Sequence, residues 1–146
     1  MIKFYKTQDP YGYMSNFYRS NIFICNDYYP TVEHAYQAAK TKNLFEKETI
    51  RNASTPRVAR DLGQKVSMYE GFEEDKYKIM KECVIAKFSQ NQRLKEQLLS
   101  TGDQFLIEDS PVDYYWGCGA DNTGQNMLGK ILMEVRSELR YVKSLG

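Results

Sequence analysis

A short segment near residue 35 places groups with chemical potential on one face of a predicted helix. The i, i+3, i+4, i+7 spacing selects four polar side chains in the segment 31–40: Glu33, Tyr36, Gln37 and Lys40. Carboxylates and amines can move protons or attack an electrophilic carbon. Glu33 also falls in the first turn, where the helix dipole favours an anion. The same spacing is typical of a solvated amphipathic helix, and that interpretation stays open.

A second segment, residues 108–129, combines three aspartates, one glutamate, four glycines and the chain's one tryptophan, directly before a predicted helix. Glycines let backbone N–H groups approach a ligand, and a helix N-terminus attracts phosphate. The order of a P-loop is absent. The next glycine after Gly117 and Gly119 is Gly124, so the dinucleotide fingerprint is absent too. The segment therefore indicates either a phosphate-binding loop or a long turn with incidental glycines.

Two shorter polar pairs are weaker candidates. Ser15 and Asn16 follow Gly12 in a predicted loop, where they could turn the chain or bind a ligand hydroxyl or amide. Lys87 and Asn91 are four residues apart at the end of a predicted helix, which is also the spacing of a surface pair.

The elements that must position these residues are mostly helical. Alternating or apolar runs predict strands over residues 2–6, 21–25 and 105–108. Caps and apolar periodicity predict helices over residues 31–42, 45–53, 55–63, 73–89, 92–100 and 126–143. Because no linker or repeat interrupts residues 1–146, the sequence predicts a single helix-rich α+β domain with a small sheet.

Composition narrows the function classes. The net charge of +1, from 20 basic and 19 acidic residues, is unfavourable for non-specific nucleic-acid binding but permits a local anion pocket. Three irregularly spaced cysteines and the lone His34 predict neither a disulfide framework nor a metal site. A membrane span needs ~20 apolar residues. No such run and no signal-peptide pattern occur, so we expect a cytoplasmic protein; its oligomeric state is left open.

Taken together, the motifs resemble the NADAR (YbiA-like) family. The resemblance rests on Ser15-Asn16-Phe17, on the run from Thr31 to Lys40, on Lys87-Phe88 to Asn91, and on the stretch from Leu106 to Gly129. That last stretch contains Trp-Gly-x-Gly followed by Gly-x-Asn-x-Leu-Gly. The motifs occur in the family's order across residues 10–140, which makes the set more specific than any one motif.

The resemblance implies an N-glycosidase with an α+β fold and a pocket for an ADP-ribose-like or phosphoribosyl ligand. Such enzymes hydrolyse the bond between ribose and nitrogen. The implied substrates are early riboflavin-pathway phosphoribosylamino-pyrimidines, or ADP-ribose attached to guanine bases in nucleic acid. No metal or redox cofactor is implied, and no membrane partner.

The resemblance also suggests roles for the candidate residues. We expect Glu33 and Asp113 to be the catalytic carboxylates, while Lys40 offers a Schiff-base route as an alternative to direct hydrolysis. The predicted substrate-binding residues supply stacking, hydrogen bonds and phosphate contacts: Ser15, Asn16, Phe17, Tyr36, Gln37, Lys87, Asn91, Trp116, Gly117, Gly119, Gly124 and Asn126. A non-catalytic ADP-ribose or NAD reader, and a plain interaction module, are the competing interpretations.

Overall fold

The computed structural model describes residues 1–145 of the chain and divides them into two compact units. Unit 1 combines Met1–Tyr18 with the chain from Asn91 onward, and unit 2 is the continuous segment Arg19–Gln90. Unit 1 is thus assembled from both ends of the chain. The single-domain organisation over residues 1–146 stays a prediction.

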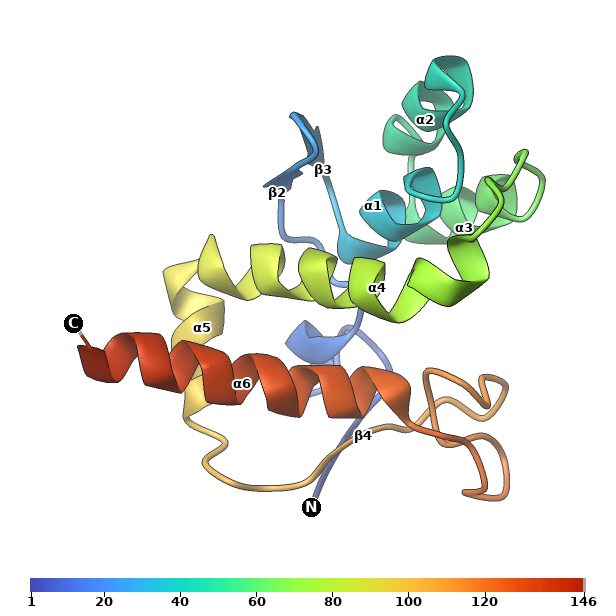
Figure 1. Cartoon of the computed structure of the whole chain (residues 1–146). Coiled ribbons are helices and arrows are strands. Elements are labelled where there is room, and N and C mark those ends of the chain that lie inside the picture. The colour runs from blue at the N-terminus through green and yellow to red at the C-terminus, as the bar shows by residue number, and fades with distance from the viewer. Residues whose placement is uncertain (146) are drawn as a thin grey trace. The chain divides into compact units, whose positions relative to one another are not determined.

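Unit 2 is built around the short helix α1, Val32–Ala38. Three other helices contact α1: α2 (Leu44–Arg51), α3 (Pro56–Gly63) and α4 (Phe72–Ser89). Figure 1 shows α2 and α3 beside α1 on one side and α4 passing along another. Because α1 is enclosed by these neighbours, every one of its residues is buried.

Side-chain caps explain where the helices of unit 2 begin. Thr31 accepts a hydrogen bond from the His34 amide at 3.1 Å, and Thr55 caps α3 in the same way just before Pro56. Asn43 caps α2 through the Glu46 amide. These local signals account for the agreement between the predicted and observed helix starts.

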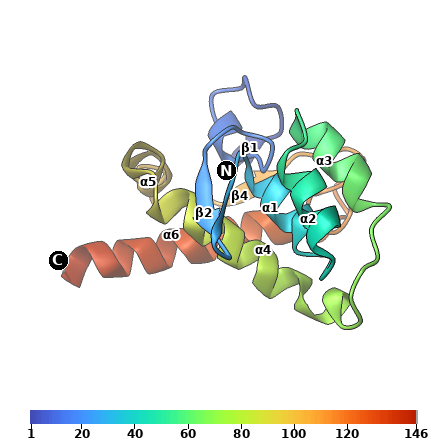
Figure 2. The same ribbon diagram turned by 90° about the horizontal axis from the view of Figure 1, so that it is seen from above.

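A β-hairpin completes unit 2 and was not fully predicted. Strand β2 (Ile22–Ile24) pairs antiparallel with β3 (Asp27–Tyr29), and α4 packs on β2, as the view in Figure 2 shows. The two turn residues Cys25 and Asn26 both have positive φ, at 54° and 66°. This is the geometry of a two-residue type I′ turn. The sequence Cys-Asn is a weaker signal for such a turn than Asn-Gly would be.

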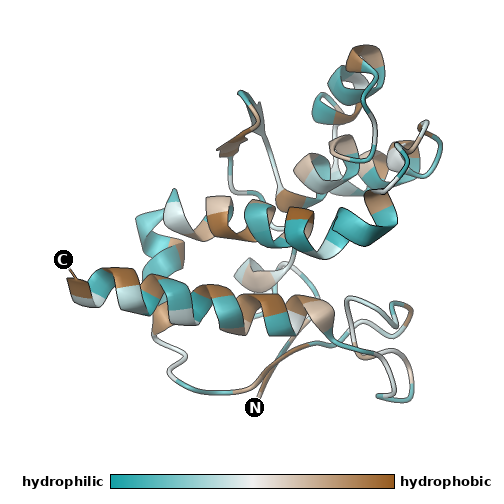
Figure 3. Ribbon diagram, in the orientation of Figure 1, coloured by the Kyte–Doolittle hydropathy of each residue, from teal (hydrophilic) through white to brown (hydrophobic). Residues whose placement is uncertain are grey.

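Unit 1 joins a parallel strand pair to a long helix. Strand β1 (Ile2–Phe4) pairs with β4 (Leu106–Glu108), and helix α6 (Met127–Leu145) packs against β4. In Figure 3 hydrophobic and hydrophilic residues alternate along the ribbon of α6, and the buried residues of this helix include Leu128, Ile131 and Val135. Helix α5 (Gln92–Leu99) packs on α6, and a 3-10 turn covers Gly12–Met14.

The predicted helix-rich α+β class is confirmed, with two corrections. The small sheet is in fact two separate two-stranded sheets. The helix predicted over residues 31–42 ends at Ala38, because the backbone that follows pairs with a distant segment: Lys40 accepts a hydrogen bond from the Tyr69 amide at 2.9 Å, and Thr41 bridges Met68. Within residues 1–145, no helix combines the length and apolar character needed to cross a membrane.

Candidate active site

The polar face of α1 is buried, so the interpretation of α1 as a solvated amphipathic helix is wrong. Only 3% of Glu33 and 4% of Gln37 is exposed. An ionised carboxylate is costly to remove from water unless hydrogen bonds or an opposite charge compensate it. The partners of Glu33 therefore decide what this carboxylate can do.

Both partners of Glu33 bind the same carboxylate oxygen. Gln37 Nε2 donates to Glu33 Oε2 at 2.6 Å, one helical turn along α1. Arg60 on α3 donates from Nε to the same Oε2 at 3.4 Å, and the two side chains form an ion pair. Among residues 1–145 no hydrogen bond reaches Oε1 of Glu33. The carboxylate is thus held through one oxygen, and its other oxygen can accept a proton from a reactant.

Lys40 lies in the turn after α1, with its Nζ 5.7 Å from the centre of the Tyr36 ring. No carboxylate of the described residues lies within salt-bridge distance of this amine. Burial lowers the pKa of Lys40 from its ordinary value, although the nearby Glu33 and Glu73 charges raise it. A lysine with a lowered pKa holds more of the neutral amine, which is the nucleophilic form.

Tyr36 and His34 have structural partners. The Tyr36 ring packs against Phe72 at 5.6 Å and is buried, so little of it is available to stack on a base. His34 is fully buried, with Nδ1 2.8 Å from Thr31 Oγ1 and Nε2 3.0 Å from the Ala53 carbonyl. Both ring nitrogens of His34 have hydrogen-bond partners, and burial is the main cause of its lowered pKa. His34 therefore stabilises the first turn of α1.

Lys87 is not the surface residue that its spacing suggested. Lys87 is 1% exposed in the last turn of α4, and its Nζ lies 5.2 Å from the Phe88 ring centre. Burial lowers the pKa of Lys87 to about 7. Asn91, the other member of the predicted pair, caps α5 by accepting from the Leu94 amide at 3.1 Å. The surface-pair interpretation is therefore wrong for both residues.

Asp113 lies in unit 1, within the loop between β4 and α6. Its Oδ1 accepts hydrogen bonds from the backbone amides of Tyr115 at 3.0 Å and Trp116 at 2.7 Å. Its own amide donates to Ser110 Oγ at 3.2 Å. One oxygen of this predicted catalytic carboxylate thus organises the loop, and its catalytic role stays a prediction.

The glycines of this loop allow close packing of the loop on itself. Gly119 has a φ of +72° and lies under the Tyr114 ring, where an added Cβ would come within 2.3 Å of a ring carbon. At Gly124 an added Cβ would lie 2.4 Å from the Gly117 carbonyl oxygen. These close approaches are enough to require glycine at positions 119 and 124, whether or not the loop binds a phosphate.

Asn126 has both of its amide atoms engaged by strand β4. Oδ1 accepts from the Glu108 amide at 2.9 Å, and Nδ2 donates to the Leu106 carbonyl at 2.9 Å. The side-chain amide of Asn126 thereby pairs with the edge of β4 as the backbone of a neighbouring strand would. Asn126 lies just before α6 and has a φ of 53°. Asn126 thus has a structural role, and its ribose- or base-binding role stays a prediction.

The remaining predicted ligand residues also lie in unit 1. Ser15 Oγ accepts from the Phe17 amide at 3.1 Å, and Asn16 beside it is buried. Trp116 is half-buried, with its ring edge-on to Tyr115 at 4.6 Å. The half-buried rings of Phe17 and Trp116 retain exposed surface, so their predicted stacking roles stay predictions.

Unit 1 also contains a cavity of about 470 Å³, a volume typical of small-ligand pockets. Its lining includes Lys3, Ile107, Cys118, Gly124 and Lys130. Of the predicted phosphate-binding glycines, Gly117 and Gly119 are absent from this lining.

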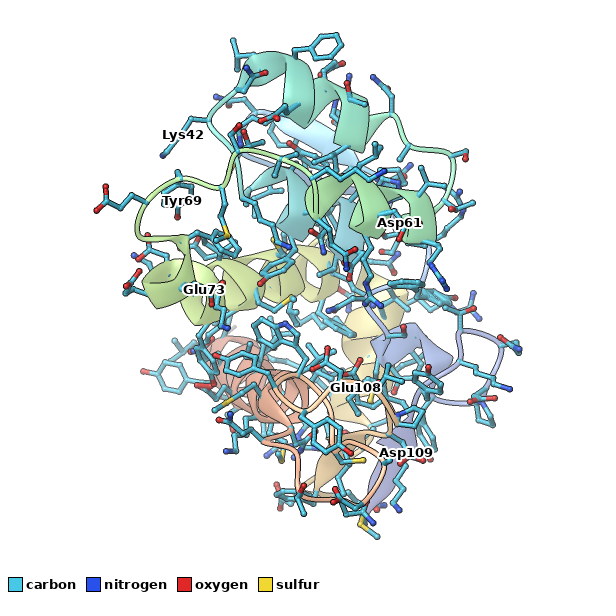
Figure 4. The ribbon with its side chains drawn as sticks, turned by 90° about the vertical axis from the view of Figure 1, so that its right-hand side faces the viewer. Lys42, Asp61, Tyr69, Glu73, Glu108 and Asp109 are labelled. Carbon is cyan, nitrogen blue, oxygen red and sulfur yellow. The ribbon has the colours of Figure 1, made fainter. Side chains whose placement is uncertain are left out.

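Within unit 2, then, Gln37 and Arg60 both bind Glu33 Oε2, and the Glu33 charge acts on Lys40 in the turn after α1. The sequence offered no local signal for Arg60, because it is 27 residues from Glu33 and looks like one of several surface arginines. Figure 4 shows the side chains around this region, with Glu73 on α4 and Lys42 beside Tyr69, where the amine lies 4.6 Å from the ring centre.

Comparison with known proteins supports the same interpretation. The NADAR domain profile matches residues 3–140. An N-glycosidase of Nostoc punctiforme is 44% identical over 99% of this chain and 96% of its own length. N-glycosidase YbiA of Escherichia coli is 38% identical over 98% of this chain and 91% of its own length. A riboflavin biosynthesis protein of Vibrio vulnificus is 36% identical over 95% of this chain, which corresponds to 38% of that longer protein.

The fold agrees as well. The NMR structure of Escherichia coli YbiA superimposes with a TM-score of 0.90 at 38% sequence identity, covering 97% of this chain and 86% of the other. The motif set, the fold and the matches along nearly the whole chain agree with one another. The chain therefore belongs to the NADAR family of N-glycosidases.

Proposed function

We propose that this protein hydrolyses the ribose–nitrogen bond of a phosphorylated, nucleotide-like substrate, with Glu33 and Lys40 as its catalytic residues. The observation that carries the proposal is the buried Glu33 carboxylate held through Oε2 alone, beside a lysine without an ion-pair partner. A merely structural glutamate would be expected to use both oxygens in the fold.

Two substrate classes share this chemistry: phosphoribosylamino-pyrimidines and ADP-ribose linked to guanine. The pyrimidines are our first choice, because the Vibrio vulnificus relative that contains a similar segment is named a riboflavin biosynthesis protein. The net charge of +1 supports a small substrate better than a long duplex footprint.

The Schiff-base route is the mechanism that the state of Lys40 supports best. The neutral amine attacks the anomeric carbon, and the base leaves with the bonding electron pair of the ribose–nitrogen bond and takes up a proton. The ring then opens: the nitrogen lone pair forms the iminium ion on Lys40, and the ring oxygen leaves with the C–O electron pair and takes up a proton to become a hydroxyl. Water adds to this ion, which releases the free sugar and returns the amine. The net reaction consumes one water molecule for each ribose–nitrogen bond that is broken.

Glu33 handles the protons in either route. Its Oε1, which no described residue occupies, can accept a proton from water or from the attacking amine. In direct hydrolysis the same oxygen would activate the water, and the negative charge would stabilise the developing positive charge on the sugar. Asp113 is proposed as a second carboxylate on the strength of the family resemblance alone.

The first test is a product analysis. The purified protein is incubated separately with a phosphoribosylamino-pyrimidine and with DNA carrying ADP-ribosylated guanine, and the products are separated by chromatography. Release of ribose 5-phosphate or of ADP-ribose supports the proposal and identifies the substrate class. Binding of ADP-ribose without turnover of either substrate would instead support a non-catalytic reader.

The second test separates the two routes. Borohydride added during a single turnover reduces an iminium ion to a stable amine, so peptide mass spectrometry should find the sugar on Lys40. The Lys40→Arg variant is the matched control and should carry no adduct. Full turnover by wild-type protein with no trapped adduct on Lys40 would leave direct hydrolysis as the route.

A further inference from the structure

Helix α3 contributes to the site although none of its residues belongs to the family motifs quoted above. Arg60 lies in the second turn of α3 and reaches the Glu33 carboxylate with a distance of 3.4 Å from Nε to Oε2. The Arg60 side chain is partly exposed, whereas the Glu33 side chain is almost fully buried. The guanidinium therefore brings a positive charge from the surface to a buried anion.

The end of α3 also determines where Gln37 can lie. A Cβ added at Gly63 would come within 2.0 Å of Gln37 Oε1 and 2.8 Å of Gln37 Cβ, so any larger residue would displace this side chain. The same Oε1 is buried and has no hydrogen-bond partner among the described residues. A buried carbonyl left without a partner destabilises the folded state. The arrangement is consistent with a functional demand, because it aims the NH2 group of Gln37 at Glu33 Oε2.

We propose that α3 is the positioning element of the catalytic carboxylate: Arg60 and Gln37 together hold Glu33 Oε2, Gly63 leaves the space that Gln37 needs, and Oε1 is left for the reacting atoms. Arg60 acts through Glu33 in this proposal and is a positioning residue. The inference rests on the proposed function, because it assumes that Glu33 is catalytic.

Arg60 has a second effect, on the charge balance around Lys40. The charged groups that face Lys40 come from three helices: Glu33 on α1, Arg60 on α3, and Glu73 and Lys76 on α4. Arg60 and Lys76 lower the pKa of Lys40, whereas Glu33 and Glu73 raise it. Removing the guanidinium should therefore raise the pKa of Lys40. The pH range in which the neutral amine is available then moves upward.

The test compares Arg60→Gln, Arg60→Lys and the control Arg57→Gln. Arg57 is on the same helix, with 78% of its side chain exposed, and its nearest acidic partner is Asp61. For Arg60→Gln we expect kcat to fall roughly 10- to 100-fold with a smaller change in KM, as for other small misplacements of a catalytic group. The acidic limb of its pH–kcat profile should move to higher pH. Arg60→Lys should keep the position of that limb and recover part of the rate, and Arg57→Gln should match wild type.

The titration of Lys40 can be followed without turnover. The rate of amine acetylation at Lys40, measured by mass spectrometry against pH, should shift upward in Arg60→Gln and not in Arg57→Gln. Gly63→Ala, which displaces Gln37 and retains Arg60, should lower kcat without that upward shift. An unchanged kcat and an unchanged Lys40 titration in folded Arg60→Gln would overturn the inference.

The failure of this inference can be told from failure of the proposed function. Wild-type protein and Glu33→Gln are measured in the same assay. If wild type is active and Glu33→Gln is not, the proposed function stands. A wild-type kcat and Lys40 titration in Arg60→Gln would then contradict only the proposal about α3. If wild type cleaves neither substrate class, the proposed function fails first.

Discussion

Helix α1 and the loop between β4 and α6 carry the polar residues that first suggested chemistry, but their side chains are used differently. In α1, Glu33 leaves one oxygen without a hydrogen bond from the described residues, and Lys40 beside it has no ion-pair partner. In the loop, Asp113 binds two backbone amides and Asn126 binds both a backbone donor and a backbone acceptor.

The difference shows how to separate function from structure in a polar cluster. Buried polar groups in folded proteins are nearly always hydrogen-bonded, and those that are not need an explanation. In the loop, Asp113 is half-buried and its Oδ1 binds backbone amides, while both amide atoms of Asn126 bind strand β4. Glu33 is almost fully buried and still has one carboxylate oxygen without a hydrogen bond from the described residues, which makes α1 the better candidate for the reacting centre. Four predictions test this contrast, and the largest effect should come from α1.

Replacing Glu33 by Gln should reduce kcat about 10²- to 10⁴-fold, the usual contribution of a positioned acid or base. The amide keeps the volume of the side chain, so circular dichroism and the melting temperature should change little. The measurement is steady-state turnover of whichever substrate class wild type cleaves. Glu82→Gln, an exposed position on α4, is the matched control. Near-normal turnover by Glu33→Gln would remove the catalytic assignment of α1.

The burial of the Lys87 amine in unit 2 can be tested through the pH dependence of the free energy of unfolding. Its pKa is about 7 in the folded protein and about 10.4 in an unfolded chain, so the unfolded state binds more protons between these values. The penalty for burying Lys87 is therefore full below pH 7 and disappears as pH rises toward 10.4. Urea unfolding from pH 7 to 10 should show that wild type gains stability relative to Lys87→Met.

The control for that series is Lys78→Met, an exposed lysine of the same helix. The difference between Lys78→Met and wild type should not depend on pH. If Lys87→Met showed the same pH dependence of stability as wild type, the buried amine would have to be charged in the folded protein.

Asn126 tests the structural side of the comparison. Asn126→Ala leaves the Glu108 amide and the Leu106 carbonyl without their side-chain partners. At about 1–3 kcal/mol for each of the two groups, the free energy of unfolding should fall by about 2–6 kcal/mol. Denaturant unfolding at constant pH measures the loss. A drop in turnover with unchanged stability would instead support the predicted ligand-binding role of Asn126.

Asp113 should give the smallest effect if its main task is structural. Asp113→Asn keeps an oxygen that can accept from the Tyr115 and Trp116 amides, whereas Asp113→Ala removes it. We expect the kcat of Asp113→Asn to be within a few-fold of the wild-type value. Asp113→Ala should lose about 1–2 kcal/mol of stability, as at a lost helix cap. A large loss of kcat in folded Asp113→Asn would instead show that the negative charge participates in catalysis.

Much of the fold follows from local sequence. The caps Thr31, Asn43, Thr55 and Asn91 all act on the amide three residues later, so a short window suffices to locate the helix starts. The end of α1 and strand β3 were harder to predict. The first depends on pairing with residues 68–69, and the second on a turn in which Cys25 and Asn26 both adopt positive φ.

The candidate site divides in the same way. The helical spacing predicted that Glu33, Gln37 and Lys40 share one face, and the family resemblance suggested their roles, because both signals lie within one short stretch of sequence. The close contacts of the loop glycines were not predictable, since a glycine that admits a phosphate and one that admits a Tyr114 ring look the same in sequence.

By itself, the sequence of this protein determined which residues share a helix face and where each helix begins, since these properties depend on neighbours three or four positions away. Only the tertiary structure decided that α1 is buried, that Arg60 and Gln37 converge on one oxygen of Glu33, and that Asn126 belongs to a strand edge. Burial and ion pairing are set by elements that packing brings together from distant parts of the chain, and no local pattern encodes that proximity.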